Sequence, residues 1–180
     1  MKYFAVLLCL LLATMAKSRE LSDLERSDLQ QRLEQFNSAM LESDFTSVID
    51  ILPPKIFEYL ATQNGLMAED IREASAEQMH AMSSSFVIHE IASSTAETDI
   101  IEVTMEGFAE ILYGAARLQF IATIDDQRAS FDTQVLTVFD DGEWYLMRVD
   151  SDKQLDILIE IYPFLTDFKV RPAIIRPAEY

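Results

Sequence analysis

The chain has 180 residues, of which 49% are apolar, and its 31 acidic residues against 14 Lys and Arg give a formal net charge of −17. This length suits one globular domain with a core of its own, so the acidity does not indicate disorder. Nucleic acids and anionic lipid surfaces are bound through Lys and Arg, so the charge argues against both as partners.

The first 16 residues have the pattern of a secretory signal peptide. Lys2 gives the positive start, residues 3–13 form the apolar run, and Thr14 and Ala16 are small residues that suit cleavage after residue 16 or within the next few residues. The apolar run is shorter than the roughly 20 residues that span a bilayer. We therefore expect a secreted or periplasmic protein with no stable membrane insertion once the signal is removed.

Cleavage would also remove Cys9, which is the only cysteine. The mature protein would then be cysteine-free, with no thiol for a disulfide, a nucleophile or a metal site. We expect a single domain over residues 17–163, followed by a C-terminal tail over residues 164–180.

The spacing of apolar residues predicts helices between residues 21 and 82. The pattern Ser22-x-x-Glu25 is typical of a capping box at the start of the first helix. Its apolar stripe consists of Leu29, Leu33, Phe36 and Met40.

Three shorter helices should follow. Ser43-Asp44 breaks the first helix and can cap the second, Pro54 suits the first turn of the third, and Gly65 suits its C-terminal cap. The fourth is expected over residues 68–82. Its inward side should carry Ile71, Ser75, Met79 and Met82.

From residue 86 the period changes from helix to strand, because Val, Ile, Thr and aromatic residues alternate with polar ones. Five antiparallel strands are predicted over residues 86–92, 99–106, 117–124, 133–139 and 143–149. Asp141-Gly142 predicts a two-residue hairpin turn, and Asp125-Asp126-Gln127 a second turn.

A last helix is predicted over residues 152–162, capped by Ser151 or Asp150. The tail that follows contains Lys169, Arg171 and Arg176 in an otherwise acidic protein.

Helices followed by a run of antiparallel strands indicate an α+β fold, with N-terminal helices packed on a curved, cone-like sheet. The chain resembles the nuclear transport factor two-like superfamily in three segments: residues 43–54, the helix ending near Met82, and the hairpin over residues 140–145. The resemblance implies a pocket between helices and sheet, often in a homodimer. Enzymes of this superfamily place Asp, Tyr or His in that pocket, but no motif here transfers such a role to a particular residue.

Five residues are candidates for ligand binding. Tyr59, Tyr113 and Tyr145 can anchor a ligand through their hydroxyls, although tyrosines more often pack the ring and hydrate the tip. His80 also suits a helix C-terminus as a cation, and Arg148 also suits an exposed strand position.

The sequence offers little for catalysis. His80 and His89 are its two histidines, no Gly-x-Ser-x-Gly pattern occurs, and His89-Glu90 lacks the second histidine of a zinc motif. We expect no metal and no cofactor. The first hypothesis is a non-catalytic domain that binds a small apolar or amphipathic molecule or a protein partner; the alternative is an isomerase, cyclase or dehydratase that uses a pocket carboxylate or His with Tyr.

Both faces of the last hairpin are largely apolar, so both need a cover. One face carries Trp144, Leu146 and Arg148, and we expect it to be the outer one because a guanidinium costs less near solvent. A homodimer or the segment over residues 164–175 could cover it.

Overall fold

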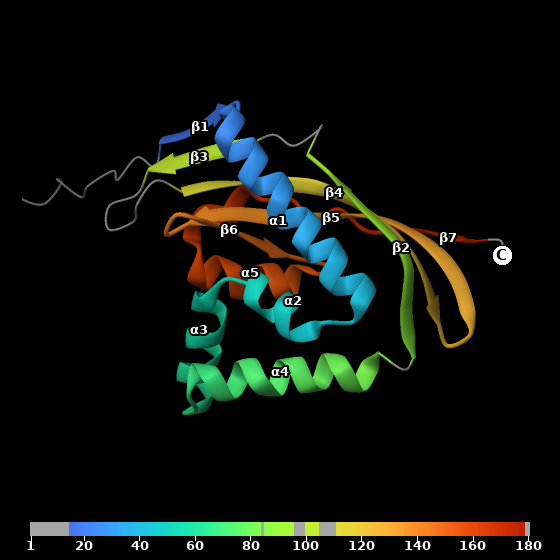
Figure 1. The fold of residues 1–180 in the computed structure, drawn as a ribbon. Helices are drawn as coiled ribbons and strands as arrows, with labels where there is room; N and C mark the ends of the chain where they lie inside the picture. Colours follow the sequence, from blue (N-terminus) through green and yellow to red (C-terminus); the bar gives the residue numbers. More distant parts are fainter. Residues whose placement is uncertain (1–14, 84, 96–99, 105–110, 179–180) are drawn as a thin grey trace, which may run out of the picture.

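The computed structural model describes residues 15–83, 85–95, 100–104 and 111–178. Within these ranges the fold is α+β, with helices packed on a curved antiparallel sheet as predicted (Figure 1). Residues 1–14 of the expected signal lie outside the described part. None of the described helices is both long enough and apolar enough to span a membrane.

Helix α1 (Asp23–Glu42) begins with the predicted capping box: Glu25 N donates to Ser22 Oγ at 3.3 Å, and Ser22 N donates to Glu25 Oε2 at 2.8 Å. It ends at Ser43, whose backbone is left-handed with φ 57°. Leu29, Leu33 and Phe36 of the predicted stripe are buried. The capping box acts within one turn of helix and the apolar stripe repeats with the helical period, so the sequence predicts both.

Helix α2 (Phe45–Ile51) is capped by Asp44, which accepts from Ser47 N at 3.2 Å. Helix α3 (Pro54–Asn64) starts with its proline and ends at Gly65, where φ is +67°. Helix α4 (Ala68–Met82) has the predicted bounds. The prediction that Met82 faces inward is wrong, because α4 packs on α2 and α3 and leaves this side chain 58% exposed.

The sheet is built around the long hairpin of β4 and β5. Its order is β1-β3-β4-β5-β6, with β2 also on β4 and β7 also on β5, and every pairing is antiparallel. The strands are β1 (Met15–Arg19), β2 (Phe86–Ser94), β3 (Ile100–Thr104), β4 (Ile111–Ile124), β5 (Gln127–Asp140), β6 (Glu143–Met147) and β7 (Ile174–Pro177).

Strands β4 and β5 each begin six residues before the predicted starts at residues 117 and 133. Gly114-Ala115-Ala116 has weak strand propensity, but β5 pairs with all three residues and β3 pairs with residues 111–113 just before them, and this pairing holds the segment extended. Both predicted turns are confirmed, with positive φ at Asp125, Asp126, Asp141 and Gly142.

The two ends of the chain also form strands that the sequence did not predict. Strand β1 includes Met15 and Ala16, which we placed in the signal, and pairs with β3. Strand β7 lies within the expected tail and pairs with β5. The signal peptide itself stays a prediction.

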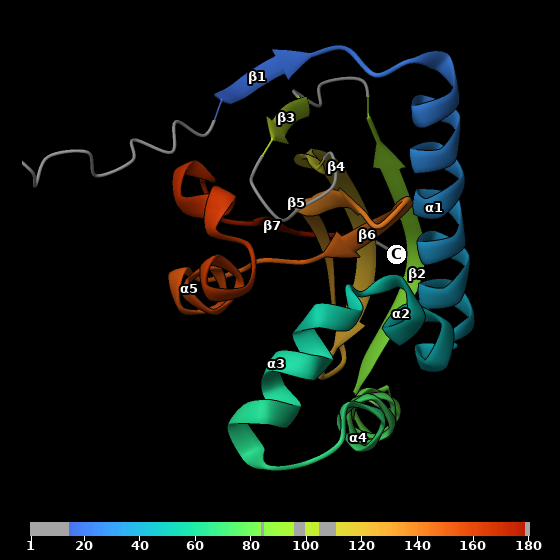
Figure 2. The same cartoon turned by 90° about the vertical axis from the view of Figure 1, so that its left-hand side faces the viewer.

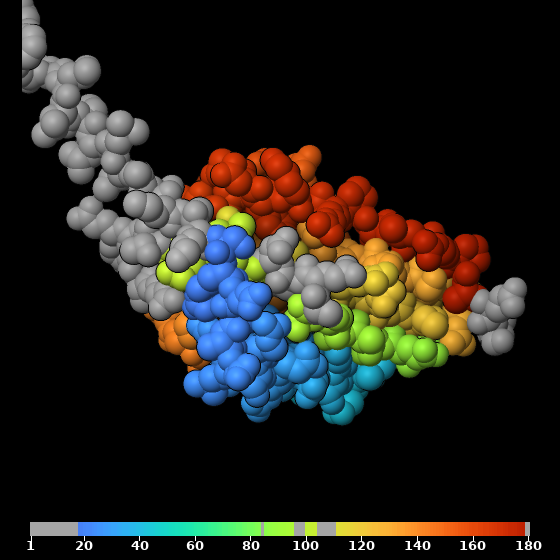
Figure 3. Space-filling model, turned by 90° about the horizontal axis from the view of Figure 1, so that it is seen from above, coloured from blue at the N-terminus to red at the C-terminus, as the bar shows by residue number. Residues whose placement is uncertain are grey.

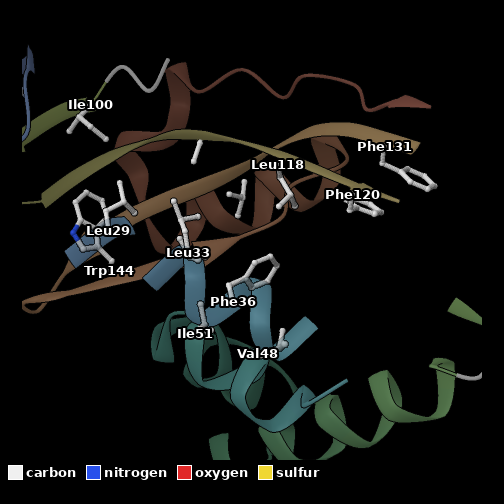
Figure 4. Packing of buried hydrophobic residues seen from close by; sticks show 14 of the residues in the cluster. Leu29, Leu33, Phe36, Val48, Ile51, Ile100, Leu118, Phe120, Phe131 and Trp144 are labelled. Atoms are coloured by element: carbon white, nitrogen blue, oxygen red, sulfur yellow. The ribbon is translucent and has the colours of Figure 1, made fainter. Parts of the chain in front are cut away.

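The sheet has a core on each face. Figure 2 shows α1 on one side of the sheet and α5 on the other. On the helix side, defined as the face toward α1 and α2, Leu29, Leu33 and Phe36 pack toward Leu118 and Trp144 (Figure 4). On the opposite face, the tail side, α5 (Asp152–Ile161) and the 3-10 helix η1 (Pro163–Asp167) supply the cover. Helix α5 is capped by Ser151.

The expectation that the face with Trp144, Leu146 and Arg148 is the outer one is wrong. Trp144 and Leu146 lie in the helix-side core, and only Arg148, which follows the last residue of β6, reaches solvent. A two-residue turn at Asp141-Gly142 places Asp140 opposite Glu143, and this register continues to Leu136 opposite Met147; the next pair along the hairpin, Val135 and Arg148, is not formed.

The tail side is covered by the chain itself. Leu165 is fully buried there, and Phe164, Phe168 and Val170 pack against the same core. Ile174 and Ile175, which we expected to join this cover, are 51% and 61% exposed, because they belong to the edge strand β7. The uncovered face that suggested a homodimer is therefore absent from the described part of the chain, which removes that argument for a dimer without testing the oligomeric state.

Candidate functional site

The C-terminal segment leaves a groove on the tail side of the sheet. After η1 the chain runs along the outside of β4 and β5, in red beside yellow and orange in Figure 3, and then pairs with β5 as β7. The groove has a volume of about 510 Å³. We call it the sheet–tail groove; it is lined by Ile101, by residues 113–117 and 132–134 of the sheet, and by most of residues 167–174.

Small residues of β4 keep the middle of this groove open. Tyr113 belongs to the tail-side core, and side chains alternate along a strand, so Ala115 and Arg117 point to the same side as Tyr113. Ala115 is only half-buried. Its methyl group leaves room that a larger side chain at this position would fill.

The Tyr113 ring closes one end of the groove. Its centroid lies 5.1 Å from that of Phe164, and the residue is only 3% exposed. The hydroxyl nevertheless makes no hydrogen bond with any residue that the structure describes. Burial, reinforced by the nearby carboxylate of Asp167, raises the pKa of Tyr113, so the hydroxyl stays protonated and can donate to a ligand.

The other end of the groove is polar. Arg117 grips Asp132 with two bonds, Nε to Oδ1 at 3.0 Å and Nη2 to Oδ2 at 2.5 Å, and these bonds lower the pKa of Asp132. Gln134, which is 6% exposed, donates to the backbone carbonyl of Lys169 at 2.9 Å and so fixes the tail over β5. An apolar end and a polar end suit an amphipathic molecule.

Two cations of the tail stand at this groove. Lys169 and Arg171 are exposed lining residues, and neither forms an ion pair with another described residue. Asp167 lines the same groove and Asp132 is already paired. The sequence had marked these two cations as unusual in an acidic chain, but not the groove beside them.

The structure does not bring the five predicted ligand residues together. Tyr113 is the one that lines the sheet–tail groove. Tyr59 donates its hydroxyl to Glu160 at the surface, and this bond raises its pKa. Arg148 pairs with Asp150 at 2.9 Å on the helix side, with its guanidinium 5.7 Å from the Phe120 centroid.

His80 lies in a second groove, between α2 and α4, with a volume of about 550 Å³. Its ring meets that of Phe45 edge-on at 6.4 Å. Several carboxylates line this groove: Asp44, Asp50, Glu69, Glu73 and Glu77. They are all exposed to water, so this groove is an acidic surface without a defined ligand position.

Tyr145 lies near a buried polar cluster that the sequence did not reveal. The Asp140 carboxylate, 3% exposed, accepts from Lys55 Nζ and from the Tyr162 hydroxyl, the latter at 3.1 Å. Burial and the charge of Asp140 raise the pKa of Tyr162, and burial also raises that of Tyr145. This cluster ties α3, the β5–β6 hairpin and α5 together, and its closed surroundings favour a structural role.

No group of three or more His, Cys, Asp or Glu side chains that could hold a metal ion occurs among the described residues. The space between α1 and the sheet, where the resemblance implied a pocket, is occupied by the helix-side core. The groove with ligand-binding features therefore lies on the opposite face of the sheet.

Comparison of the chain with protein-family models, curated proteins and solved structures found no match. The resemblance to the nuclear transport factor two-like superfamily stays a prediction. A function has to be inferred from the geometry of the groove.

Proposed function

We propose that this chain is an exported, non-catalytic protein that holds a small amphipathic molecule in the sheet–tail groove. The observation that carries the proposal is the Tyr113 hydroxyl: the residue lines the groove and is 3% exposed overall, and its hydroxyl has no hydrogen-bond partner among the described residues. The hydroxyl oxygen is not fully buried, so water can reach it, and a ligand acceptor can take the place of that water. The volume of about 510 Å³ lies in the range of small-molecule sites.

The groove offers little for catalysis. Two of the titratable side chains that line it, Arg117 and Asp132, form an ion pair with each other. Asp140 and Tyr162 do converge, but at 3% and 0% exposure they are out of reach of a substrate. We therefore favour binding over the isomerase, cyclase or dehydratase alternative.

The test is to fill the groove. Ala115→Val, Ala115→Leu and Ala115→Phe add increasing volume at its centre, and we expect them to weaken binding of the neutral fluorescent probe N-phenyl-1-naphthylamine in that order. The phenylalanine variant should bind at least about tenfold more weakly, because a ring there removes most of the space. Titration of probe fluorescence against folded protein gives the affinity.

Ala74→Phe is the matched control, because Ala74 is an exposed alanine of α4 that does not line the groove. It should leave binding unchanged. Unfolding midpoints of all variants show whether each remains folded. Equal binding by the wild type and by a folded Ala115→Phe variant would place the probe elsewhere and overturn the proposal.

A further inference from the structure

The charges around the sheet–tail groove point to the class of molecule that it binds; this step rests on the proposed function. Lys169 and Arg171 supply two positive charges without described ion-pair partners, whereas Asp167 supplies one negative charge. The opposite charges of Arg117 and Asp132 cancel each other in an ion pair. The groove thus has a positive balance in a protein whose formal net charge is −17.

We propose that the ligand is an amphipathic anion, with its apolar body against Ile101, Ala115 and Phe168 and its oxyanion bound by Lys169 and Arg171. A carboxylate, a sulfonate and a phosphate monoester share this chemistry. Tyr113 donates a hydrogen bond to an oxygen of the same molecule, since its hydroxyl stays protonated.

The negative charge of the whole protein does not prevent this. Exposed charges are screened beyond about 8 Å at physiological ionic strength, so the charges lining the groove decide which ion it prefers. Guanidinium and ammonium groups near an apolar surface are also the ordinary means of binding carboxylates and phosphates. A cationic ligand would meet Lys169 and Arg171 at the same place and be repelled.

Two probes with the same aromatic skeleton test the charge. One is 8-anilinonaphthalene-1-sulfonate, which is anionic, and the other is N-phenyl-1-naphthylamine, which lacks the sulfonate. The double variant Lys169→Gln/Arg171→Gln should bind the anion about tenfold more weakly, since it loses two charge-assisted contacts, and should bind the neutral probe within about twofold of wild type. About 1 M salt should weaken the binding of the anionic probe but not that of the neutral probe.

Arg26→Gln is the control for losing a positive charge away from the groove, because Arg26 is an exposed residue of α1 without a described ion pair. It should change neither affinity.

The outcomes separate the two proposals. If Ala115→Phe blocks the neutral probe but the double variant and salt leave the anion unaffected, the ligand is not selected by charge and this inference fails while the proposed function stands. If Ala115→Phe blocks neither probe, or the wild type binds neither, the groove is not the site and both fail. If the double variant binds the neutral probe more weakly than the wild type does, the substitutions have displaced the tail, and this result would also overturn the charge argument.

Discussion

Tyr162 and Tyr59 each donate a hydroxyl hydrogen bond to a carboxylate, but in different surroundings. Tyr162 is fully buried and bonds Asp140, whereas the bond from Tyr59 to Glu160 is exposed. A buried carboxylate that loses a donor cannot replace it with water. The same chemical bond should therefore contribute differently to stability at the two positions.

We expect Tyr162→Phe to lower the free energy of unfolding by about 1–3 kcal/mol at neutral pH, and Tyr59→Phe to lower it much less. Urea unfolding of both variants measures this. Similar small losses would show that Lys55 alone satisfies Asp140.

The same buried tyrosine makes stability depend on alkaline pH. Burial raises the pKa of Tyr162 above its ordinary value of about 10. The protonated side chain therefore contributes fully to the free energy of unfolding below about pH 10, and this contribution is lost as the pH rises toward the pKa of the folded state. Tyr162→Phe should reduce this alkaline loss of stability, and Tyr59→Phe should reduce it less.

Among the secondary-structure elements, β1 is attached to the domain through its pairing with β3 and through the Arg19 side chain. Arg19 donates from Nη2 to Glu25 Oε1 at 2.5 Å, and its Nε lies 2.7 Å from Glu102 Oε2. It thus joins β1, the first turn of α1 and β3. Chiefly through the Arg19 bond, the pKa of Glu25 falls from 4.5 to about 2.

This lowered pKa fixes the sign of an acid dependence. The contribution of the Arg19 pair is complete above pH 4.5 and is lost as the pH falls toward 2. We expect Arg19→Gln to cost about 1–2 kcal/mol at pH 7, less than the shift alone implies because solvent screens the pair, and to cost little at pH 2.

Urea unfolding at pH 7, 5, 3 and 2 checks this, with Arg26→Gln as the control from the same region. A constant difference between wild type and Arg19→Gln over this range would show that the pair with Glu25 does not stabilise the fold. A mature terminus directly after residue 16 would keep Arg19, whereas one at Glu20 would remove it.

For the whole molecule, the cover of the tail side decides the expected assembly. Leu165 is fully buried within the chain, and Phe164 and Phe168 pack at the edge of the same core. With this face covered, the reason for sheet-to-sheet dimerisation is gone. We expect the full-length protein to be a monomer by light scattering.

Truncation tests this cover. A chain ending at Tyr162 should lose at least about 3 kcal/mol of stability and expose apolar surface, because it loses the buried Leu165 and its neighbours. A chain ending at Val170 keeps them and loses β7 and other residues that are exposed or at most half-buried, so it should retain most of the stability. A stable dimer of the full chain, or indifference to the Tyr162 truncation, would contradict this.

The sequence by itself determined the features that arise within a few residues. The capping box of Ser22 and Glu25, the proline start of α3, the left-handed Gly65 and the Asp141-Gly142 turn each depend on local backbone geometry. The alternation of apolar residues then gave the α+β class. These signals are present in the chain before it folds.

Only the tertiary structure decided which surfaces meet. Arg32 Nε donates to the carbonyl of Trp144 at 2.9 Å, across 112 positions of sequence, and no local pattern shows that this face of the hairpin lies under α1. The same holds for the groove, since Tyr113 lines the same groove as Lys169 and Arg171 only because the tail runs back across β4 and β5. Apolar patterning shows that a face must be buried, but contacts between distant segments determine what buries it.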